Sequence, residues 1–102
     1  MITWMRSAVI NHGKRAGALA WALEVSAYVN DSFGTNIGVH GNVAGPVNQI
    51  HWVATYDSLS AFEEIAGRII QDDGYNRLLE QSSEANYFST HSFKDTLYQS
   101  LG

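Results

Sequence analysis

The sequence predicts a small α+β domain whose elements follow one another in the order β-α-β-β-α-β. A chain of 102 residues is the usual length for one hydrophobic core, so residues 1–102 are expected to form a single domain. Segments in which apolar residues alternate with period two are separated by segments with helical spacing. Two of the alternating segments flank the only proline, Pro46, which indicates a hairpin between neighbouring strands.

The first third of the chain is expected to form a strand followed by a long helix. Residues 2–10 alternate, and the positions that share one face are Ile2, Trp4, Arg6, Ala8 and Ile10. From residue 14 to residue 33 the apolar residues follow helical spacing, and Gly34 is predicted to end the helix in the left-handed conformation. The apolar stripe of this helix is wider than one sheet needs, which suggests additional cover.

The central hairpin is predicted from residues 37–43 and 48–56, which alternate on either side of Gly45-Pro46. A turn centred on these two residues sets the register of the two strands. In this register His40 lies opposite His51, and both side chains lie on the face opposite to Trp52.

The second half of the chain is predicted to add two helices and a fourth strand. Asp57 and Ser58 can cap a long helix, and residues 75–82 can form a short further one. Residues 86–93 are rich in Tyr, Phe, Thr and Ser and are predicted as the fourth strand. The tail, residues 94–102, either extends this strand or forms an arm that reaches a partner. The whole order corresponds to a ferredoxin-like fold, a four-stranded antiparallel sheet with helices on one face.

The composition limits the expected partners. Hydrophobic residues make up 45% of the chain and charged residues only 16%, so a second copy is expected to cover apolar surface in a homodimer. The net charge is −4 and no Lys or Arg cluster occurs, so nucleic acid is not an expected partner. The absence of cysteine excludes disulfides and thiolate chemistry. No segment has the pattern of a leader or a membrane span, so a cytoplasmic location is the expectation.

One segment carries a family resemblance. Residues 49–63 combine a strand, a Tyr-Asp-Ser-Leu corner and the start of a helix. This segment resembles small dimeric α+β barrel proteins, above all NIPSNAP-type and antibiotic-biosynthesis-monooxygenase-type domains, and the element order extends the resemblance over residues 2–93. It implies a homodimer in which two sheets pack face to face to form a barrel with the helices outside. Members include cofactor-free monooxygenases, isomerases, haem-degrading enzymes and proteins without known activity, so no catalytic residue is carried over.

Four residues are the candidates for ligand binding. Histidines 40, 51 and 91 can act as acids, bases or hydrogen-bonding groups near neutral pH. Arg6 shares the apolar face of its strand with Trp4, so it needs an acidic partner or a ligand anion, unless it reaches solvent at the sheet edge. The functional hypothesis is a pocket inside the barrel that holds a small acidic or aromatic ligand and is lined by Arg6, His40, His51 and His91. The alternative is that the histidines are hydrogen-bonded interface residues on a partly solvated sheet face.

The sequence contains no motif for a metal or a larger cofactor, and none is expected. It lacks His-x-His, Glu-x-x-His and His-Glu-x-x-His spacings, and the glycines at 38, 41 and 45 do not form a phosphate loop. Two functions remain open: a dimeric domain that binds a small ligand, and a cofactor-independent monooxygenase or isomerase acting on an aromatic or polyketide-like substrate. We expect the first, because no acid–base pair in the sequence demands chemistry.

Overall fold

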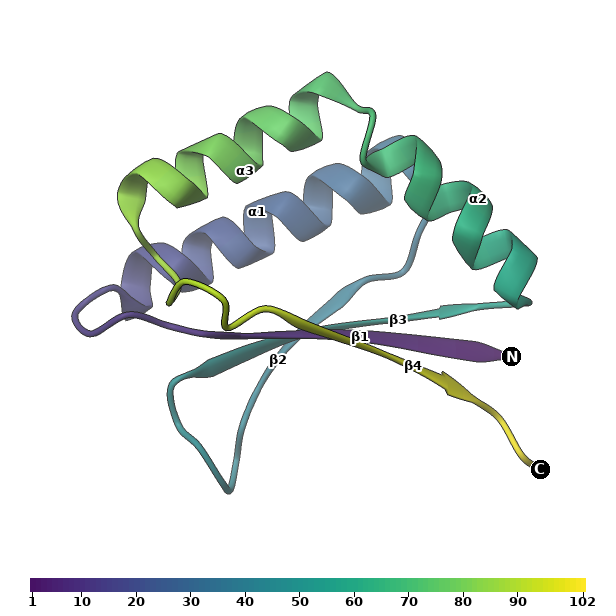
Figure 1. Ribbon diagram of the computed structural model, residues 1–102, viewed down its shortest axis with the longest axis horizontal. Coiled ribbons are helices and arrows are strands. Elements are labelled where there is room, and N and C mark those ends of the chain that lie inside the picture. Colours follow the sequence, from purple (N-terminus) through teal and green to yellow (C-terminus); the bar gives the residue numbers. More distant parts are fainter.

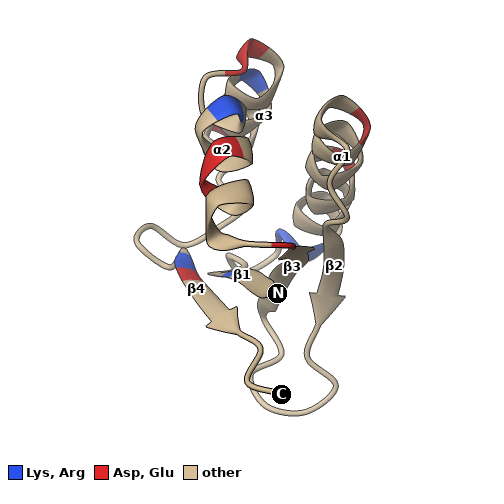
Figure 2. Ribbon diagram, turned by 90° about the vertical axis from the view of Figure 1, so that its right-hand side faces the viewer, with Lys and Arg blue, Asp and Glu red and all other residues tan.

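The computed structural model describes all 102 residues as a four-stranded antiparallel sheet with three helices on one face (Figure 1). In chain order the elements are β1 (Ile2–Val9), α1 (Arg15–Phe33), β2 (Gly38–Gly41), β3 (Gln49–Tyr56), α2 (Leu59–Ile69), α3 (Asp73–Ala85) and β4 (Lys94–Gln99). This is the ferredoxin-like arrangement that the sequence predicts. Figure 2 shows that all three helices lie on the same side of the sheet, so its other face is left open.

The sheet has the strand order β2-β3-β1-β4, so β1 and β3 are interior strands and β2 and β4 form the edges. The predicted hairpin register is confirmed: Val39 pairs with Trp52 and His40 with His51. Since directly opposed residues point to the same face, both histidines lie on the open face, away from Trp52. Strand β2 is shorter than predicted because residues 42–48 form a wide loop instead of a tight turn.

The core lies between the sheet and helix α1. Ala18 and Ala22 are completely buried, and their small side chains let the helix lie close against the sheet. Trp21, Trp52 and Phe88 meet edge to face within this layer, with ring centroids between 5.7 and 6.2 Å apart. The aromatic contacts therefore join α1, β3 and the segment after α3 into one cluster.

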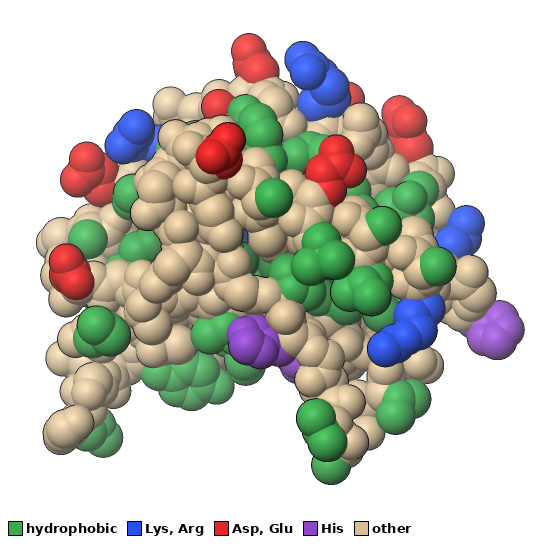
Figure 3. All heavy atoms as spheres, turned by 180° about the vertical axis from the view of Figure 1, so that it is seen from behind, with side chains coloured by type: hydrophobic (Ala, Val, Ile, Leu, Met, Phe, Trp, Pro, Cys, Tyr) green, Lys and Arg blue, Asp and Glu red, His purple; other side chains and the backbone are tan.

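Helix α1 ends as predicted, since Gly34 adopts the left-handed conformation with φ 68°. Part of its broad apolar stripe stays uncovered: Leu19 and Leu23 are 42% and 55% exposed. Figure 3 shows the molecule from the α1 side, where hydrophobic side chains form a patch and charged side chains stand singly around it. The additional cover that the stripe suggests is thus not supplied within the chain.

Helix α2 is the least buried of the three. It begins after Ser58, whose Oγ accepts a hydrogen bond from the Ala61 amide at 3.1 Å, as the capping prediction requires. None of its residues is fully buried, and Leu59, its first residue, is 48% exposed. None of the three helices combines the length and apolar character needed to cross a bilayer.

Helix α3 is longer than the short helix predicted, because its start is capped and it is tied to α1. Asp72 Oδ2 accepts from the Tyr75 amide at 2.9 Å and from the Tyr28 hydroxyl at 2.6 Å. The Tyr28 hydrogen bond lowers the pKa of Asp72 and raises that of Tyr28 itself. Farther along, Trp21 Nε1 donates to the Leu78 carbonyl oxygen at 2.8 Å. Two hydrogen bonds from α1 therefore fix α3 against it.

The predicted fourth strand, residues 86–93, is wrong. Asn86 and His91 both have a left-handed backbone, with φ 57° and 64°, and only Phe88 makes an isolated bridge, to Ile10. The fourth strand is β4, which lies in the tail and pairs with β1. Of the two alternatives for the tail, a strand is therefore correct, but it is not an extension of residues 86–93. All residues of β4 are exposed, so no buried apolar alternation marks it in the sequence.

Replacing Gly74 with Ala is expected to destabilise the domain by about 1–2 kcal/mol, although Ala is the better helix former. A Cβ atom at Gly74 would lie 2.1 Å from the Tyr28 hydroxyl oxygen, so Tyr28 would have to leave Asp72. The free energy of unfolding in urea checks this. The matched control is Gly67→Ala on α2, where a Cβ meets no atom within 4 Å and a gain of about 0.5–1 kcal/mol is expected. Equal gains in both variants would contradict the close contact.

Candidate functional site

The structure does not bring the four predicted site residues into one pocket. Arg6 lies on the helix-covered face, opposite Asp95 of β4, whereas His40 and His51 lie on the open face. His91 stands in the loop between α3 and β4 and borders a separate hollow of about 290 Å³. The shared pocket is therefore wrong, because alternation along the strands sends Arg6 and His51 to opposite faces. Ligand binding by the individual residues stays a prediction.

Arg6 lines a cleft between the sheet and the helices. The cleft consists of two adjoining cavities of about 50 and 120 Å³, and nine of the 11 residues that line each cavity are hydrophobic. The residues common to both cavities are Trp4, Arg6, Val29, Ile37 and Tyr75. The larger cavity, at about 120 Å³, approaches the size of about 150 Å³ that holds benzene, so an aromatic ring would need part of the adjoining cavity as well.

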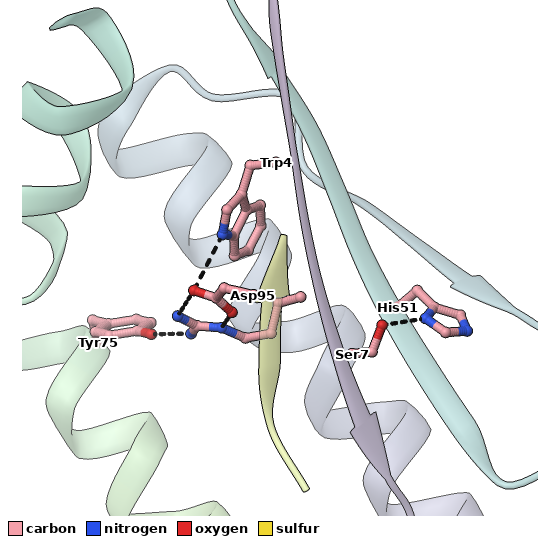
Figure 4. A network of polar contacts seen from close by, with 6 residues as sticks. Trp4, Ser7, His51, Tyr75 and Asp95 are labelled. Atoms are coloured by element: carbon pink, nitrogen blue, oxygen red, sulfur yellow. Dashed lines mark hydrogen bonds and ion pairs between the residues drawn. The ribbon is translucent and has the colours of Figure 1, made fainter. Parts of the chain in front are cut away.

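An ion pair stands at the edge of this cleft. Arg6 Nε donates to Asp95 Oδ1 at 2.6 Å and Nη2 donates to Asp95 Oδ2 at 2.8 Å, so the pair is bidentate (Figure 4). The hydrogen bonds to Asp95 raise the pKa of Arg6, and those from Arg6 lower the pKa of Asp95. Both side chains are only partly exposed, at 33% and 44%. The arginine thus has the acidic partner that its apolar surroundings require.

Two aromatic side chains complete the polar edge of the cleft. Arg6 Nη1 donates to the Tyr75 hydroxyl oxygen at 3.3 Å, which leaves the Tyr75 proton free to be donated elsewhere. Trp4 Nε1 donates to Asp95 Oδ2 at 3.4 Å, and its ring centroid lies 5.4 Å from the Arg6 guanidinium carbon. The edge of the cleft therefore presents hydrogen-bond donors. The charges of the Arg6–Asp95 ion pair at this edge cancel.

A second polar network lies on the open face. His51 Nδ1 lies 2.6 Å from Ser7 Oγ, and His51 Nε2 lies 2.5 Å from Asn42 Oδ1. Figure 4 shows the Ser7–His51 contact on one side of β1 and the Asp95 network on the other. No group of three or more His, Asp or Glu side chains in the chain is placed to hold a metal ion.

Sequence reasoning identified Arg6 but missed Asp95 and Tyr75. Arg6 and Asp95 are 89 positions apart, and only the pairing of β1 with β4 makes them neighbours. The one signal was the need of Arg6 for an acidic partner, and ten acidic residues could have supplied it. Tyr75 was predicted as a helical residue, and nothing in the helix pattern indicates which strand it faces.

The NIPSNAP family model matches residues 4–94 of the chain, which is most of its length. The chain belongs to the NIPSNAP family. The resemblance inferred from residues 49–63 is thereby confirmed. No curated protein sequence matches this NIPSNAP chain.

Solved structures place this NIPSNAP domain among ferredoxin-like proteins. An uncharacterised NIPSNAP domain protein from Burkholderia xenovorans has a TM-score of 0.82 and 16% identity, over 100% of this chain and 96% of that one. A NIPSNAP family protein from Agrobacterium tumefaciens has a TM-score of 0.79 and 20% identity, over 96% and 90%. A candidate antibiotic biosynthesis monooxygenase from Deinococcus radiodurans has a TM-score of 0.72 and 13% identity, over 100% and 94%. At these identities the likeness shows the fold alone.

Replacing Asp95 with Asn in this NIPSNAP domain is expected to remove a pH-dependent part of its stability. Because Arg6 lowers the pKa of Asp95 in the folded state, folding favours the charged carboxylate. This stabilisation is present above the unfolded Asp pKa of about 3.9 and is lost as the pH falls through the lower folded value. For a partly exposed pair its size is about 1 kcal/mol or less.

Urea unfolding of the unmodified chain and of Asp95→Asn, compared at neutral pH and at successively lower pH, measures this contribution. The difference between the two should shrink as the solution is acidified. Asp31→Asn, on the exposed side of α1, is the matched control and should not show this shrinking difference. A difference between the unmodified chain and Asp95→Asn that does not change with pH would mean that the ion pair adds no stability.

Proposed function

We propose that this NIPSNAP domain binds a small, neutral aromatic molecule that carries one hydroxyl or carbonyl oxygen. The observation that carries the proposal is the cleft between sheet and helices, whose walls are mostly apolar and whose edge holds the balanced Arg6–Asp95 pair. Apolar and aromatic walls with a few fixed polar groups are typical of small-molecule sites.

The balanced pair favours a neutral ligand over an acidic one. A carboxylate ligand would have to compete with Asp95, which already occupies the Nε and Nη2 donors of Arg6. A neutral oxygen needs only a single donor, and the proton of Tyr75 or a remaining guanidinium N–H can supply one. Placing an extra negative charge beside Asp95 in this partly desolvated site would also cost free energy.

The second candidate function is a cofactor-independent monooxygenase or isomerase. Aromatic side chains around the cleft and the fold shared with candidate antibiotic biosynthesis monooxygenases support it. It ranks second because Asp95, the carboxylate at the cleft, is held charged by Arg6 and has both oxygens engaged, so it is a poor proton acceptor. Oxygen consumption with a quinol-type substrate would favour this function over simple binding.

The proposed functional unit is a homodimer in which a second copy covers the open sheet face. Lys94 is the only charged residue at the strand positions that point to this face, and Met5, Val9 and Val53 lie among them. In Figure 1 the β2–β3 loop and the C-terminal tail project beyond the sheet on this side. The open face is therefore a weakly charged surface bounded by two projecting segments. A second copy of the same shape can pack against such a surface.

Ligand preference can be tested with three single-ring probes that differ in one group: toluene, p-cresol and p-toluate. p-Cresol is expected to bind more tightly than toluene, because it gains a hydrogen bond at the cleft edge, and more tightly than p-toluate, because p-toluate is charged. Indole N–H signals of Trp4, Trp21 and Trp52, which line the cleft, report binding by nuclear magnetic resonance.

The matched variants are Arg6→Met and Arg15→Met. The first removes a donor at the cleft and is expected to weaken p-cresol several-fold more than toluene. The second makes the same change on an exposed arginine outside the cleft and should leave all three affinities unchanged. Tighter binding of p-toluate than of p-cresol would refute the preference for a neutral ligand.

Light scattering at tens of micromolar is expected to give the mass of a dimer, with an interface above about 1,200 Å² of total buried area. Val53→Lys, at the centre of the open face between Met5 and Gly38, should shift the mass to that of a monomer. Leu23→Lys on α1 places the same charge on the opposite side and should leave the dimer intact. A monomeric unmodified chain, or a dimer broken only by Leu23→Lys, would overturn the proposed assembly.

A further inference from the structure

The hollow at the C-terminal end of α3 is lined mainly by hydroxyl, amide and imidazole groups. Its volume is about 290 Å³, and only four of its ten lining residues are hydrophobic. No Lys, Arg, Asp or Glu is among the ten. The polar lining residues are Ser82, Ser83, Asn86, Ser89, Thr90 and His91. Groups of these kinds can exchange hydrogen bonds with a neutral molecule that carries several hydroxyl groups.

Ser82 supplies the observation that points to a ligand in this hollow. It is only 8% exposed, yet its hydroxyl makes no hydrogen bond within the chain. Ser26, the other buried polar residue, differs because its Oγ donates to the Ala22 carbonyl oxygen at 2.8 Å. No completely enclosed side-chain polar atom lacks a partner, so the Ser82 hydroxyl is reached from the hollow that it lines. A ligand hydroxyl can therefore supply the partner that the chain does not.

The loop that forms the other wall of the hollow is fixed to β1. The Ser89 amide donates to the Val9 carbonyl oxygen at 2.8 Å, and the Val9 amide donates to Ser92 Oγ at 3.1 Å. The Ser92 amide closes a turn by donating to the Ser89 carbonyl oxygen at 3.2 Å. Within this turn His91 has φ 64°, a conformation that favours glycine. A strained backbone of this kind is typical of residues whose side chain has a function.

The hollow borders the cleft. Trp21, Leu79 and Phe93 line both the hollow and the smaller cavity of the cleft. An open depression of about 400 Å³ also has Leu79 and Phe93 in its wall, and its other lining residues are Arg6 and its two hydrogen-bond partners. Leu79 is 37% and Phe93 46% exposed, so this boundary lies at the surface of the molecule. One ligand can therefore extend from the polar edge of the cleft into the hollow.

We propose that the hollow holds a neutral, hydroxyl-rich ring linked to the aromatic ring in the cleft, so that the ligand is an aromatic glycoside. This inference rests on the proposed function of the cleft and extends it. At about 290 Å³ the hollow exceeds the size of about 150 Å³ that holds benzene, so a six-membered ring with hydroxyl substituents has room. The exposed ring of Phe93 offers apolar surface to the C–H groups of a sugar.

The hollow also stays open to solvent in the proposed dimer. It lies among α1, α3 and the loop after α3, on the helix side of the sheet, whereas the second copy is placed on the open face (Figure 1). Ser83, Thr90 and His91 are exposed at its rim. A ligand therefore reaches the hollow without separating the two copies.

The test compares two phenols that differ in one group: 4-methoxyphenol and 4-hydroxyphenyl β-D-glucopyranoside. Both carry the same phenol hydroxyl and the same para ether oxygen, and only the second carries a sugar ring. The glucoside is expected to bind about 10-fold more tightly, because its hydroxyls meet the free polar groups of the hollow. Indole N–H signals of the intact chain measure both affinities, and the Trp21 signal should shift further with the glucoside.

Two variants locate this gain in the hollow. Ser82→Ala is expected to weaken the glucoside about 5-fold and to leave 4-methoxyphenol unchanged. Ser60→Ala, on an exposed serine of α2 outside the cleft and the hollow, is the matched control and should change neither affinity. His91→Gly suits the left-handed backbone, so it should leave the midpoint of urea unfolding nearly unchanged while it weakens the glucoside about 5-fold.

The two phenols separate the failure of this inference from the failure of the proposed function. A glucoside that binds no more tightly than 4-methoxyphenol, or whose advantage survives both Ser82→Ala and His91→Gly, would overturn the inference and leave the cleft as a site for aromatic molecules. Absence of binding by both phenols would overturn the proposed function and the inference together. If Ser82→Ala proves unfolded by circular dichroism, His91→Gly decides.

Discussion

The structure depends on the two-sided character of β1. This strand lies inside the sheet, and its side chains alternate between the helix layer and the open face. Trp4 and Arg6 belong to the first side, and Met5 and Ser7 to the second. A shift of one residue in pairing would exchange the two sets, burying Ser7 in the core and exposing Trp4. Register along one strand thus decides where both polar networks of the molecule stand.

Much of the fold could be predicted because local patterns and tertiary pairing agree. The β2–β3 register follows from apolar positions that match across the loop of residues 42–48, and the Gly34 cap follows from glycine's tolerance of positive φ. The fourth strand could not be predicted in the same way. Tyr87 and Phe88 have the composition of a strand, but they serve as core cover after α3, while the true edge strand has no buried side that would leave a pattern.

Only the part of the candidate site that one residue indicates by itself could be predicted from the sequence. Arg6 on an apolar face signals a missing anion, and that much was correct. The identity of the anion depends on which distant segment pairs with β1, a choice made by the whole sheet and not by local sequence. Histidine can act as an acid, a base or a hydrogen-bonding group, which makes it a candidate for many sites, but alternation along β2 and β3 places His40 and His51 on the other face of the sheet. Residue type indicates which interactions a side chain can make, whereas the topology of the sheet decides which residues it makes them with.

The pairing of the first strand with the last has a consequence for how the molecule is made. During synthesis β1 can pair with β3 as soon as both have been made, but β4 is the last of the four strands. Until then β1 has an open edge and Arg6 has no carboxylate beside it. A nascent chain that lacks β4 therefore holds an uncompensated charge against its aromatic layer. Pairing of β4 with β1 closes this long loop at an entropic cost and brings Asp95 to the edge of the cleft.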